Sequence, residues 1–131
     1  MSNKVIKSMT PYVTGNAEED GLKNIPKGWF VGHFIDPALG LRCTEALEIK
    51  WGVHRKNEER ATLSDNKIGM TLTILVSGSF VIYFPEHDRT IELKHQGDYV
   101  LFAPKVAHSW KVIEDSVVLT VRWPSKLNDK N

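Results

Sequence analysis

The sequence predicts an all-β fold, a single domain whose strands close into a barrel. Short segments rich in aromatic and β-branched residues recur along the chain, and turn-forming residues separate them. Residues 43–53 alternate between apolar and polar side chains, as a half-buried strand does. No segment carries the apolar repeat of an amphipathic helix. Because a sheet of this size must protect its edges, closure into a barrel is the expected solution.

Composition limits the class of protein. The chain has 131 residues, enough for one domain with a core and too few for two ordinary domains. The net charge of +1 predicts no nucleic-acid partner and no attraction to a membrane surface. No segment approaches the ~20 apolar residues of a membrane span, and the N-terminus carries no apolar run of signal-peptide length. Cys43 is the only cysteine, so no intramolecular disulfide can form. We therefore expect a cytoplasmic protein.

Three regions are expected along the chain. Residues 1–27 are polar and interrupted by proline and glycine, which predicts an N-terminal arm with one short strand at Pro11–Thr14. The barrel is expected over residues 28–125 and a polar tail over residues 126–131. Lys56–Gly69 is polar and predicts a long loop. The predicted strands are Trp29–Ile35, Cys43–Val53, Met70–Val76, Phe80–Phe84, Thr90–Leu93, Tyr99–Phe102, Ser109–Ile113 and Ser116–Trp123.

The strand Cys43–Val53 has two unlike faces. One face carries Leu47, Ile49, Trp51 and Val53, and the other carries Glu48, Lys50, Gly52 and His54. Since only one face can line the barrel interior, the apolar face must be covered by the second sheet, by the arm or by another subunit. We predict a homodimer.

The segment Gly97–Trp110 contains a Gly-Asp turn, an apolar strand, a proline corner at Pro104 and then His108. This order resembles the second sequence motif of the cupin family, whose histidine points into a small jelly-roll barrel. The resemblance covers about Leu47–Trp123 and implies a cupin-type jelly-roll β-barrel. More narrowly, Lys50–His54 with Thr120–Ser125 resembles small, poorly characterised bacterial cupins. Some of these carry the label signal peptidase, which this sequence does not support.

The first cupin motif is degenerate. His54 matches its first histidine and Gly78 its closing glycine, whereas Lys56 and Thr71 stand where a histidine and a glutamate are expected. The resemblance implies a divalent transition metal, iron, zinc, nickel or manganese, held by His54 and His108. The third ligand is unknown. The candidates for it are Glu48, Glu58, Glu59 and His33.

Other residues suit a pocket for an organic anion. Arg122 alternates with Thr120 on the last strand, so it is either an inward clamp for a carboxylate or phosphate or an outward side chain stacked on Trp123 or Trp110. Lys50 shares the His54 face and is either a second pocket charge or an edge lysine. The predicted pocket residues are His54, His108, Arg122, Lys50, Lys56 and Thr71.

Three functions remain open, and the sequence does not decide whether the protein is an enzyme. The first is a cupin that binds a small, anionic molecule in the barrel. The alternative is a metal-dependent dioxygenase or isomerase using His54 and His108. The third is a metal-free epimerase, which needs a histidine paired with a carboxylate and a tyrosine acid such as Tyr83 or Tyr99.

Overall fold

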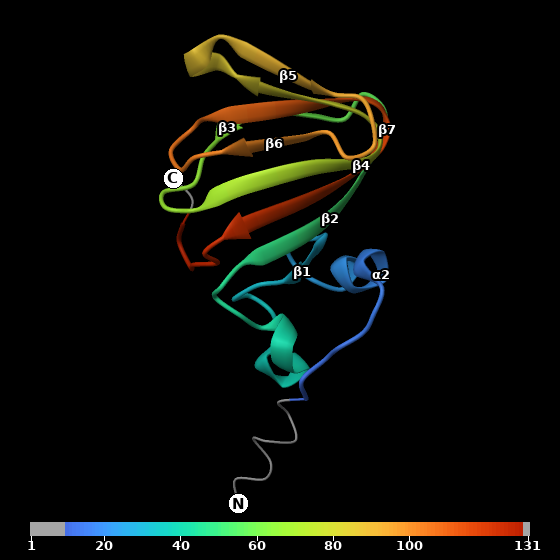
Figure 1. The fold of residues 1–131 in the computed structure, drawn as a ribbon, viewed down its shortest axis with the longest axis vertical. Coiled ribbons are helices and arrows are strands. Elements are labelled where there is room, and N and C mark those ends of the chain that lie inside the picture. The colour runs from blue at the N-terminus through green and yellow to red at the C-terminus, as the bar shows by residue number, and fades with distance from the viewer. Residues whose placement is uncertain (1–9, 130–131) are drawn as a thin grey trace, which may run out of the picture.

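Two long antiparallel strands form the spine of the fold. The computed structural model describes residues 10–129, and in it β4 (Met70–Phe84) pairs with β7 (His108–Trp123) from Met70↔Trp123 to Tyr83↔Ser109. The register shifts between Leu75 and Phe80, so both strands bend there. The seven strands form one hydrogen-bonded sheet that folds over at this bend, so each long strand runs through both of its halves, the first and the second sheet of the barrel (Figure 1).

The shorter strands add to the two ends of this spine. On the first sheet, β1 (Trp29–Val31) pairs with β2 (Glu48–His54), β2 with the second half of β7, and β6 (Tyr99–Phe102) with the first half of β4. On the second sheet, β3 (Glu59–Ser64) pairs with the first half of β7, and β5 (Arg89–Leu93) with the second half of β4. The two sheets enclose the interior of the barrel.

The bend in β4 depends on Gly78 and Ser116. Gly78 has φ +98°, and a Cβ atom there would collide with the backbone of Asp115. The Ser116 hydroxyl donates its one hydrogen to the carbonyl oxygen of Glu114 at 2.6 Å, lies 3.1 Å from the carbonyl oxygen of Ser79 and accepts from the Ser79 N–H at 3.0 Å. These bonds hold the two bent strands together at the corner.

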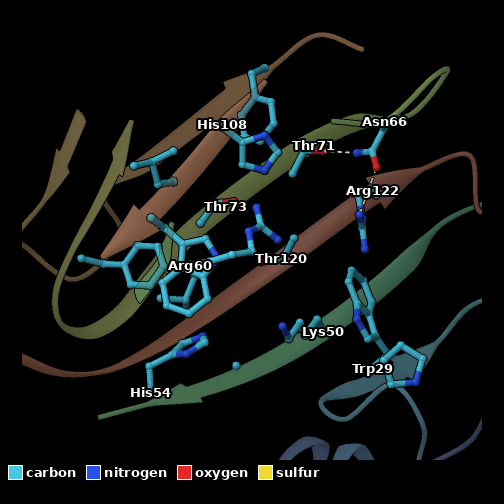
Figure 2. A pocket seen from close by; sticks show the side chains of 17 residues that line it. Trp29, Lys50, His54, Arg60, Asn66, Thr71, Thr73, His108, Thr120 and Arg122 are labelled. Atoms are coloured by element: carbon cyan, nitrogen blue, oxygen red, sulfur yellow. Dashed lines mark hydrogen bonds between the residues drawn. The ribbon is translucent and has the colours of Figure 1, made fainter. Parts of the chain in front are cut away.

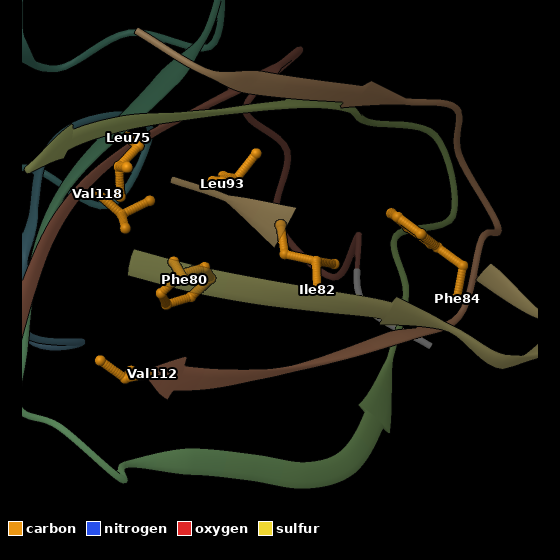
Figure 3. Close-up of a cluster of buried hydrophobic side chains, with 7 residues drawn as sticks. All are labelled: Leu75, Phe80, Ile82, Phe84, Leu93, Val112 and Val118. Carbon is orange, nitrogen blue, oxygen red and sulfur yellow. The ribbon is translucent and has the colours of Figure 1, made fainter. Parts of the chain in front are cut away.

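The hydrophobic core lies beside this corner. It is formed by seven buried side chains, which Figure 3 shows: Leu75, Phe80, Ile82, Phe84, Leu93, Val112 and Val118. All but Leu93 come from β4 and β7, because these strands turn one face inward along both sheets. The core lies chiefly on the second sheet, and Leu75 and Val118 extend it to the first sheet, where Val118 lies opposite Gly52 of β2.

The all-β prediction is confirmed, but several strands differ in their bounds, and the predicted strand Cys43–Val53 begins only at Glu48. The two predicted strands on each side of Ser77–Gly78, and those on each side of Glu114–Asp115, are continuous strands that bend. The expected loop Lys56–Gly69 contains β3, and Trp29–Ile35 is a strand only as far as Val31. No strand forms at Pro11–Thr14.

The arm instead contains a short helix, α2 (Ala17–Leu22), whose first turn is capped by the Asn16 side chain accepting from the Glu19 N–H at 3.0 Å. Two 3-10 helices, η1 (Pro37–Arg42) and η2 (Pro85–His87), complete the described elements. Residues 1–9 of the predicted arm and 130–131 of the predicted tail lie outside the described residues. Between residues 10 and 129 there is no helix with the length and apolar character needed to cross a membrane.

Candidate functional site

A cavity of about 260 Å³ lies inside the barrel, against the polar face of β2. Its wall combines residues of both sheets with Trp29 at the start of β1 (Figure 2). The lining side chains are polar or aromatic for the most part, and the polar ones are Lys50, His54, Arg60, Asn66, Thr71, Thr73, His108, Thr120 and Arg122.

Strand pairing explains why polar residues from distant parts of the chain meet here. Lys50 lies opposite Thr120, which lies opposite Thr73. In the neighbouring row, Arg122 lies opposite both Glu48 and Thr71. Because residues that are paired across strands project to the same face, the polar face of β2 and the inward faces of β7 and β4 form one continuous polar wall.

Three cations line this cavity. Lys50 comes from β2, Arg60 from β3 and Arg122 from β7, and no aspartate or glutamate is among the lining residues of the described chain. Burial lowers the pKa of Lys50, and the nearby charges of Arg122 and Arg60 lower it further. The lining side chains therefore carry net positive charge, and Glu48, which lies behind the wall, balances only that of Arg122.

Arg122 is held in place from three sides. Its Nε atom lies 3.0 Å from Oε2 of Glu48; the N–H is not well aligned for a hydrogen bond, so this contact is chiefly an ion pair. Nη1 donates to Oδ1 of Asn66 at 3.1 Å, and Asn66 donates in turn to the Thr71 hydroxyl. The guanidinium lies 4.2 Å from the ring centroid of Trp29. Arg122 is thus an inward side chain, and the outward alternative is wrong.

Behind Arg122, Glu48 is itself part of a buried network. The Ser125 hydroxyl donates to Glu48 Oε1 at 2.8 Å and accepts from the His33 N–H at 3.0 Å. His33 Nδ1 lies 2.7 Å from the same hydroxyl. Because that hydroxyl has one hydrogen and directs it at Glu48, we assign the proton of this contact to His33 Nδ1. No local pattern indicates this contact, because the residues that it joins lie 77 and 92 positions apart in the sequence.

His54 is paired with a carboxylate at the other end of β2. Its Nδ1 atom lies 3.2 Å from Oε1 of Glu58, and its ring packs 4.8 Å from that of Trp110. Burial lowers the pKa of His54, and the hydrogen bond to Glu58 only partly opposes this effect. Glu58 has a lowered pKa, mainly because its carboxylate accepts from the Arg55 N–H. A neutral His54 therefore faces the cavity beside an ionised Glu58 at neutral pH.

His108 lies on the opposite side of the cavity from His54 in Figure 2. Its Nδ1 atom is 3.1 Å from the carbonyl oxygen of Val106, and its ring lies 4.7 Å from that of Phe102. The preceding turn has Lys105 at φ +66°, the left-handed conformation that favours glycine.

The donor set does not fit the metal that the cupin resemblance implies. No group of three or more His, Cys, Asp or Glu side chains is arranged to hold a metal ion in residues 10–129. Each suggested third ligand near the site is already engaged: Glu48 by Arg122, Glu58 by His54 and His33 by Ser125. The structure therefore places two histidines on the wall without a third donor.

Five of the six predicted pocket residues lie on the cavity wall: His54, His108, Arg122, Lys50 and Thr71. Lys56 does not. Its side chain is 59% exposed and lies 4.0 Å from Glu114. The Lys56 N–H is bound by the Asp115 side chain, and the next residue, Asn57, has φ +74°, so the turn carries Lys56 into solvent. Placing Lys56 in the pocket was wrong.

The sequence also missed Arg60, Asn66 and Trp29 as pocket residues. Residues 59–64 alternate only weakly between polar and apolar side chains, and no other pattern in the sequence indicates β3. Tyr83 and Tyr99, named for the epimerase hypothesis, do not line the cavity as the structure describes it. His87 and His95 are exposed and lie away from the cavity wall.

The fold is similar to those of solved cupin structures. A cupin superfamily protein from Desulfitobacterium hafniense superposes with a TM-score of 0.52 and 19% identity, covering 60% of this chain and 67% of that one. KdgF from a Halomonas species gives a TM-score of 0.56 and 18% identity over 63% and 74% of the two chains. An RmlC-like cupin from Desulfovibrio desulfuricans gives a TM-score of 0.54 and 18% identity, covering 62% of this chain and 74% of that one.

These comparisons identify the architecture. The sequence matches no protein-family model and is not similar to any curated protein. The identities to the solved structures are below one fifth, and similarity at that level is one of fold. The protein has the all-β cupin fold, as the sequence predicted.

Proposed function

We propose that this protein binds a small organic anion inside its barrel. One observation carries the proposal: Lys50, Arg60 and Arg122 line one cavity whose described wall has no acidic side chain. Glu48 balances the charge of Arg122, but Lys50 and Arg60 have no acidic partner among residues 10–129, so their partly buried charges cost the apo protein stability. A bound carboxylate or phosphate offsets this cost and gains charge-assisted hydrogen bonds.

Neutral groups on the wall suit the rest of such a ligand. The hydroxyls of Thr73 and Thr120 lie between the cations, and Phe80 and Trp110 form a stacked pair with ring centroids 5.4 Å apart. Small-molecule sites commonly combine an apolar wall with a few polar groups that fix orientation. The cavity of about 260 Å³ limits the ligand to roughly the size of one substituted ring.

The test is titration with simple anions, followed by heteronuclear NMR. Benzoate and phosphate are expected to shift the ring resonances of His54 and His108 and the indole resonance of Trp110. The dissociation constant obtained from these shifts should rise at least about tenfold in Arg60→Met, because the variant loses one charge-assisted contact with the anion. The control Lys56→Met removes an exposed lysine outside the cavity and should bind as the wild type does. If no anion perturbs these resonances in folded wild-type protein, the proposed function is wrong.

A second candidate function is proton transfer to or from the bound anion. The favouring observation is the His54–Glu58 pair, because a neutral imidazole oriented by a carboxylate is a competent proton acceptor. If a bound carboxylic acid exchanges its α-proton, deuterium from solvent will enter that position in the wild type. The exchange should be lost in His54→Gln and reduced in Glu58→Gln. If an anion binds and no deuterium enters it, the proton-transfer function is wrong and the binding function remains.

A further inference from the structure

We propose that the ligand is a compact dianion, carrying two acidic groups or one phosphate monoester, with an unsaturated or apolar body. This inference rests on the proposed function, because it specifies the charge of the anion bound at the same site. It follows from which pocket cations already have a counter-ion in the fold and which do not.

Arg122 is neutralised by the protein itself. Its guanidinium is paired with Glu48 at 3.0 Å, and its Nη1 atom is used by Asn66. Arg122 therefore brings no net charge that a ligand must balance, although its remaining N–H groups face the cavity. Lys50 and Arg60 differ, since neither has an acidic partner within ion-pair distance among residues 10–129.

Of these two cations, Arg60 gives the stronger indication of a missing anion. Its Nε atom is buried and has no hydrogen-bond partner in the described part of the chain. Buried guanidinium nitrogens without a partner are rare, since each one loses hydration and gains nothing in return. Figure 2 shows Arg60 in the middle of the pocket view, beside Thr73 and Thr120. A ligand oxygen at this place would satisfy the orphaned donor.

Lys50 approaches the cavity from the other sheet. It projects from β2, whereas Arg60 projects from β3. Burial lowers the pKa of the Lys50 amine, and the nearby charges of Arg122 and Arg60 lower it further. His54 adds no charge near neutral pH, since burial lowers its pKa. Two uncompensated cations from opposite walls match two negative charges on one small molecule, either as separate carboxylates or as one phosphate.

The body of the ligand is expected to be flat or apolar. Trp110, the register partner of Arg60, stacks on Phe80 with an interplanar angle of 28°. Ile82, Phe102 and Val118 extend this apolar side of the cavity. An unsaturated body would therefore lie against the aromatic pair while its acidic groups meet Lys50 and Arg60.

Matched probes that differ in charge but hardly in shape test this inference. Phenyl phosphate is largely a dianion above about pH 7, since the second pKa of a phosphate monoester is about 6, whereas phenyl sulfate is a monoanion. Isophthalate and its monomethyl ester form the corresponding carboxylate pair. Isothermal titration at constant ionic strength should show the dianion of at least one pair binding about tenfold more tightly than its monoanion. The pair that responds distinguishes a phosphate site from a dicarboxylate site.

Variants assign the preference to the two cations. Lys50→Met and Arg60→Met should each reduce the preference for the dianion to about threefold or less. Each substitution removes a positive charge and keeps a long side chain. Lys50→Arg should keep it, and Lys56→Met should leave it unchanged. Equal binding of monoanion and dianion by the wild type would overturn this inference while leaving the proposed function intact. A preference that survives in both methionine variants would overturn it as well. If none of the four probes binds, both the inference and the proposed function fail.

Discussion

Glu48 and Arg122 face each other across the pairing of β2 with β7, and the carboxylate Oε2 atom lies 3.0 Å from the guanidinium Nε atom. Both side chains are nearly buried, with exposed fractions of 12% and 13%. The pair is enclosed by Ser125 behind the carboxylate and by Trp29 on one face of the guanidinium. The fold therefore fixes the position of the arginine before any ligand arrives.

Removing the carboxylate should destabilise the protein strongly. Glu48→Gln leaves Arg122 buried without a counter-ion, and breaking one partner of a buried ion pair costs about 3–5 kcal/mol. Urea unfolding followed by circular dichroism measures this loss. The matched control is Glu45→Gln, which breaks the exposed pair with Lys126 at 3.4 Å and should cost less than about 1 kcal/mol. Equal losses in the two variants would show that burial of the Glu48 pair contributes nothing.

The hydroxyl of Ser125 should be needed for the same arrangement. Ser125 is fully buried and bonds to both Glu48 and His33. Ser125→Ala leaves their polar atoms unsatisfied, so we expect a loss of about 1–3 kcal/mol in the free energy of unfolding. Ser77→Ala removes an exposed hydroxyl from β4 and should change the stability by less than about 0.5 kcal/mol. A Ser125→Ala protein as stable as the Ser77→Ala control would contradict this role.

Local pattern was sufficient to predict much of the barrel and one wall of the site. The alternation along β2 places Lys50 and His54 on one face, and the alternation of Thr120 with Arg122 does the same for β7. Period-two alternation is a property of the strand itself, so it needs no knowledge of the strand's partners. The pattern thus grouped these residues by face, but it left open whether Lys50 and Arg122 point inward, and the structure places both on the cavity wall.

Residues whose position depends on distant partners escaped prediction. Arg60 reaches the cavity because β3 pairs with β7 about fifty residues away, at Arg60↔Trp110. The hydrogen bond from Ser125 to Glu48 likewise joins residues 77 positions apart in the sequence. Lys56 was assigned from a family pattern whose spacing this chain does not keep, and its turn directs it outward. Tertiary contacts, not local preference, decide these three positions.

Removing the Lys50 charge should stabilise the apo protein and weaken anion binding at the same time. The native state lowers the pKa of this amine below 10.5, so it disfavours the charged form that predominates at neutral pH. Lys50→Met keeps the length of the side chain and relieves this repulsion. We expect a gain of about 0.5–2 kcal/mol, in the range typical of relieving strain at a functional site.

Thermal unfolding without and with phenyl phosphate measures both effects. The wild type should be stabilised by the ligand, whereas Lys50→Met should start from a higher melting temperature and gain less. Lys56→Met should behave like the wild type in both measurements, because its charge is exposed. A Lys50→Met protein that is less stable and still binds tightly would contradict the prediction.

The pKa of His54 should appear as a pH dependence of stability. Since burial lowers the native pKa below 6.5, the unfolded state binds the proton more readily. The stabilising contribution of neutral His54 is complete above about pH 6.5 and is lost as the pH falls through the native pKa. We therefore expect the free energy of unfolding to decrease as the pH falls below about 6.5.

Comparison with His54→Gln isolates this contribution. Urea unfolding between about pH 7.5 and pH 5.5 should give a smaller slope in the variant, by at most about 1.4 kcal/mol per pH unit for one proton. His87→Gln, which alters an exposed turn histidine, should keep the wild-type slope. Identical slopes in the wild type and in His54→Gln would show that the native pKa of His54 is not lowered.

The outer face of the first sheet should be an interface between two copies of this chain. The residues that alternate with the pocket wall are apolar: Ile49, Trp51, Val53, Leu72, Ile74, Val117, Leu119 and Val121. Helix α2 covers only the side near β2, where Glu18 accepts from the Trp51 indole at 3.4 Å. Val53 and Leu101, at 55% and 48% exposed, remain open on this face. An apolar patch of this extent is typical of an interaction surface.

A charge in the middle of this face should prevent dimerisation. Leu119 lies between Trp51 on β2 and Ile74 on β4, so Leu119→Arg would bury an unpaired guanidinium in the interface. Multi-angle light scattering at micromolar concentration should give a dimer for the wild type and a monomer for this variant. Leu63→Arg, on β3 and away from this face, should remain dimeric. Because the pocket lies on the other face of the same sheet, monomeric Leu119→Arg should still bind phenyl phosphate, which separates loss of assembly from loss of folding. A wild-type protein that is monomeric at this concentration would contradict the interface.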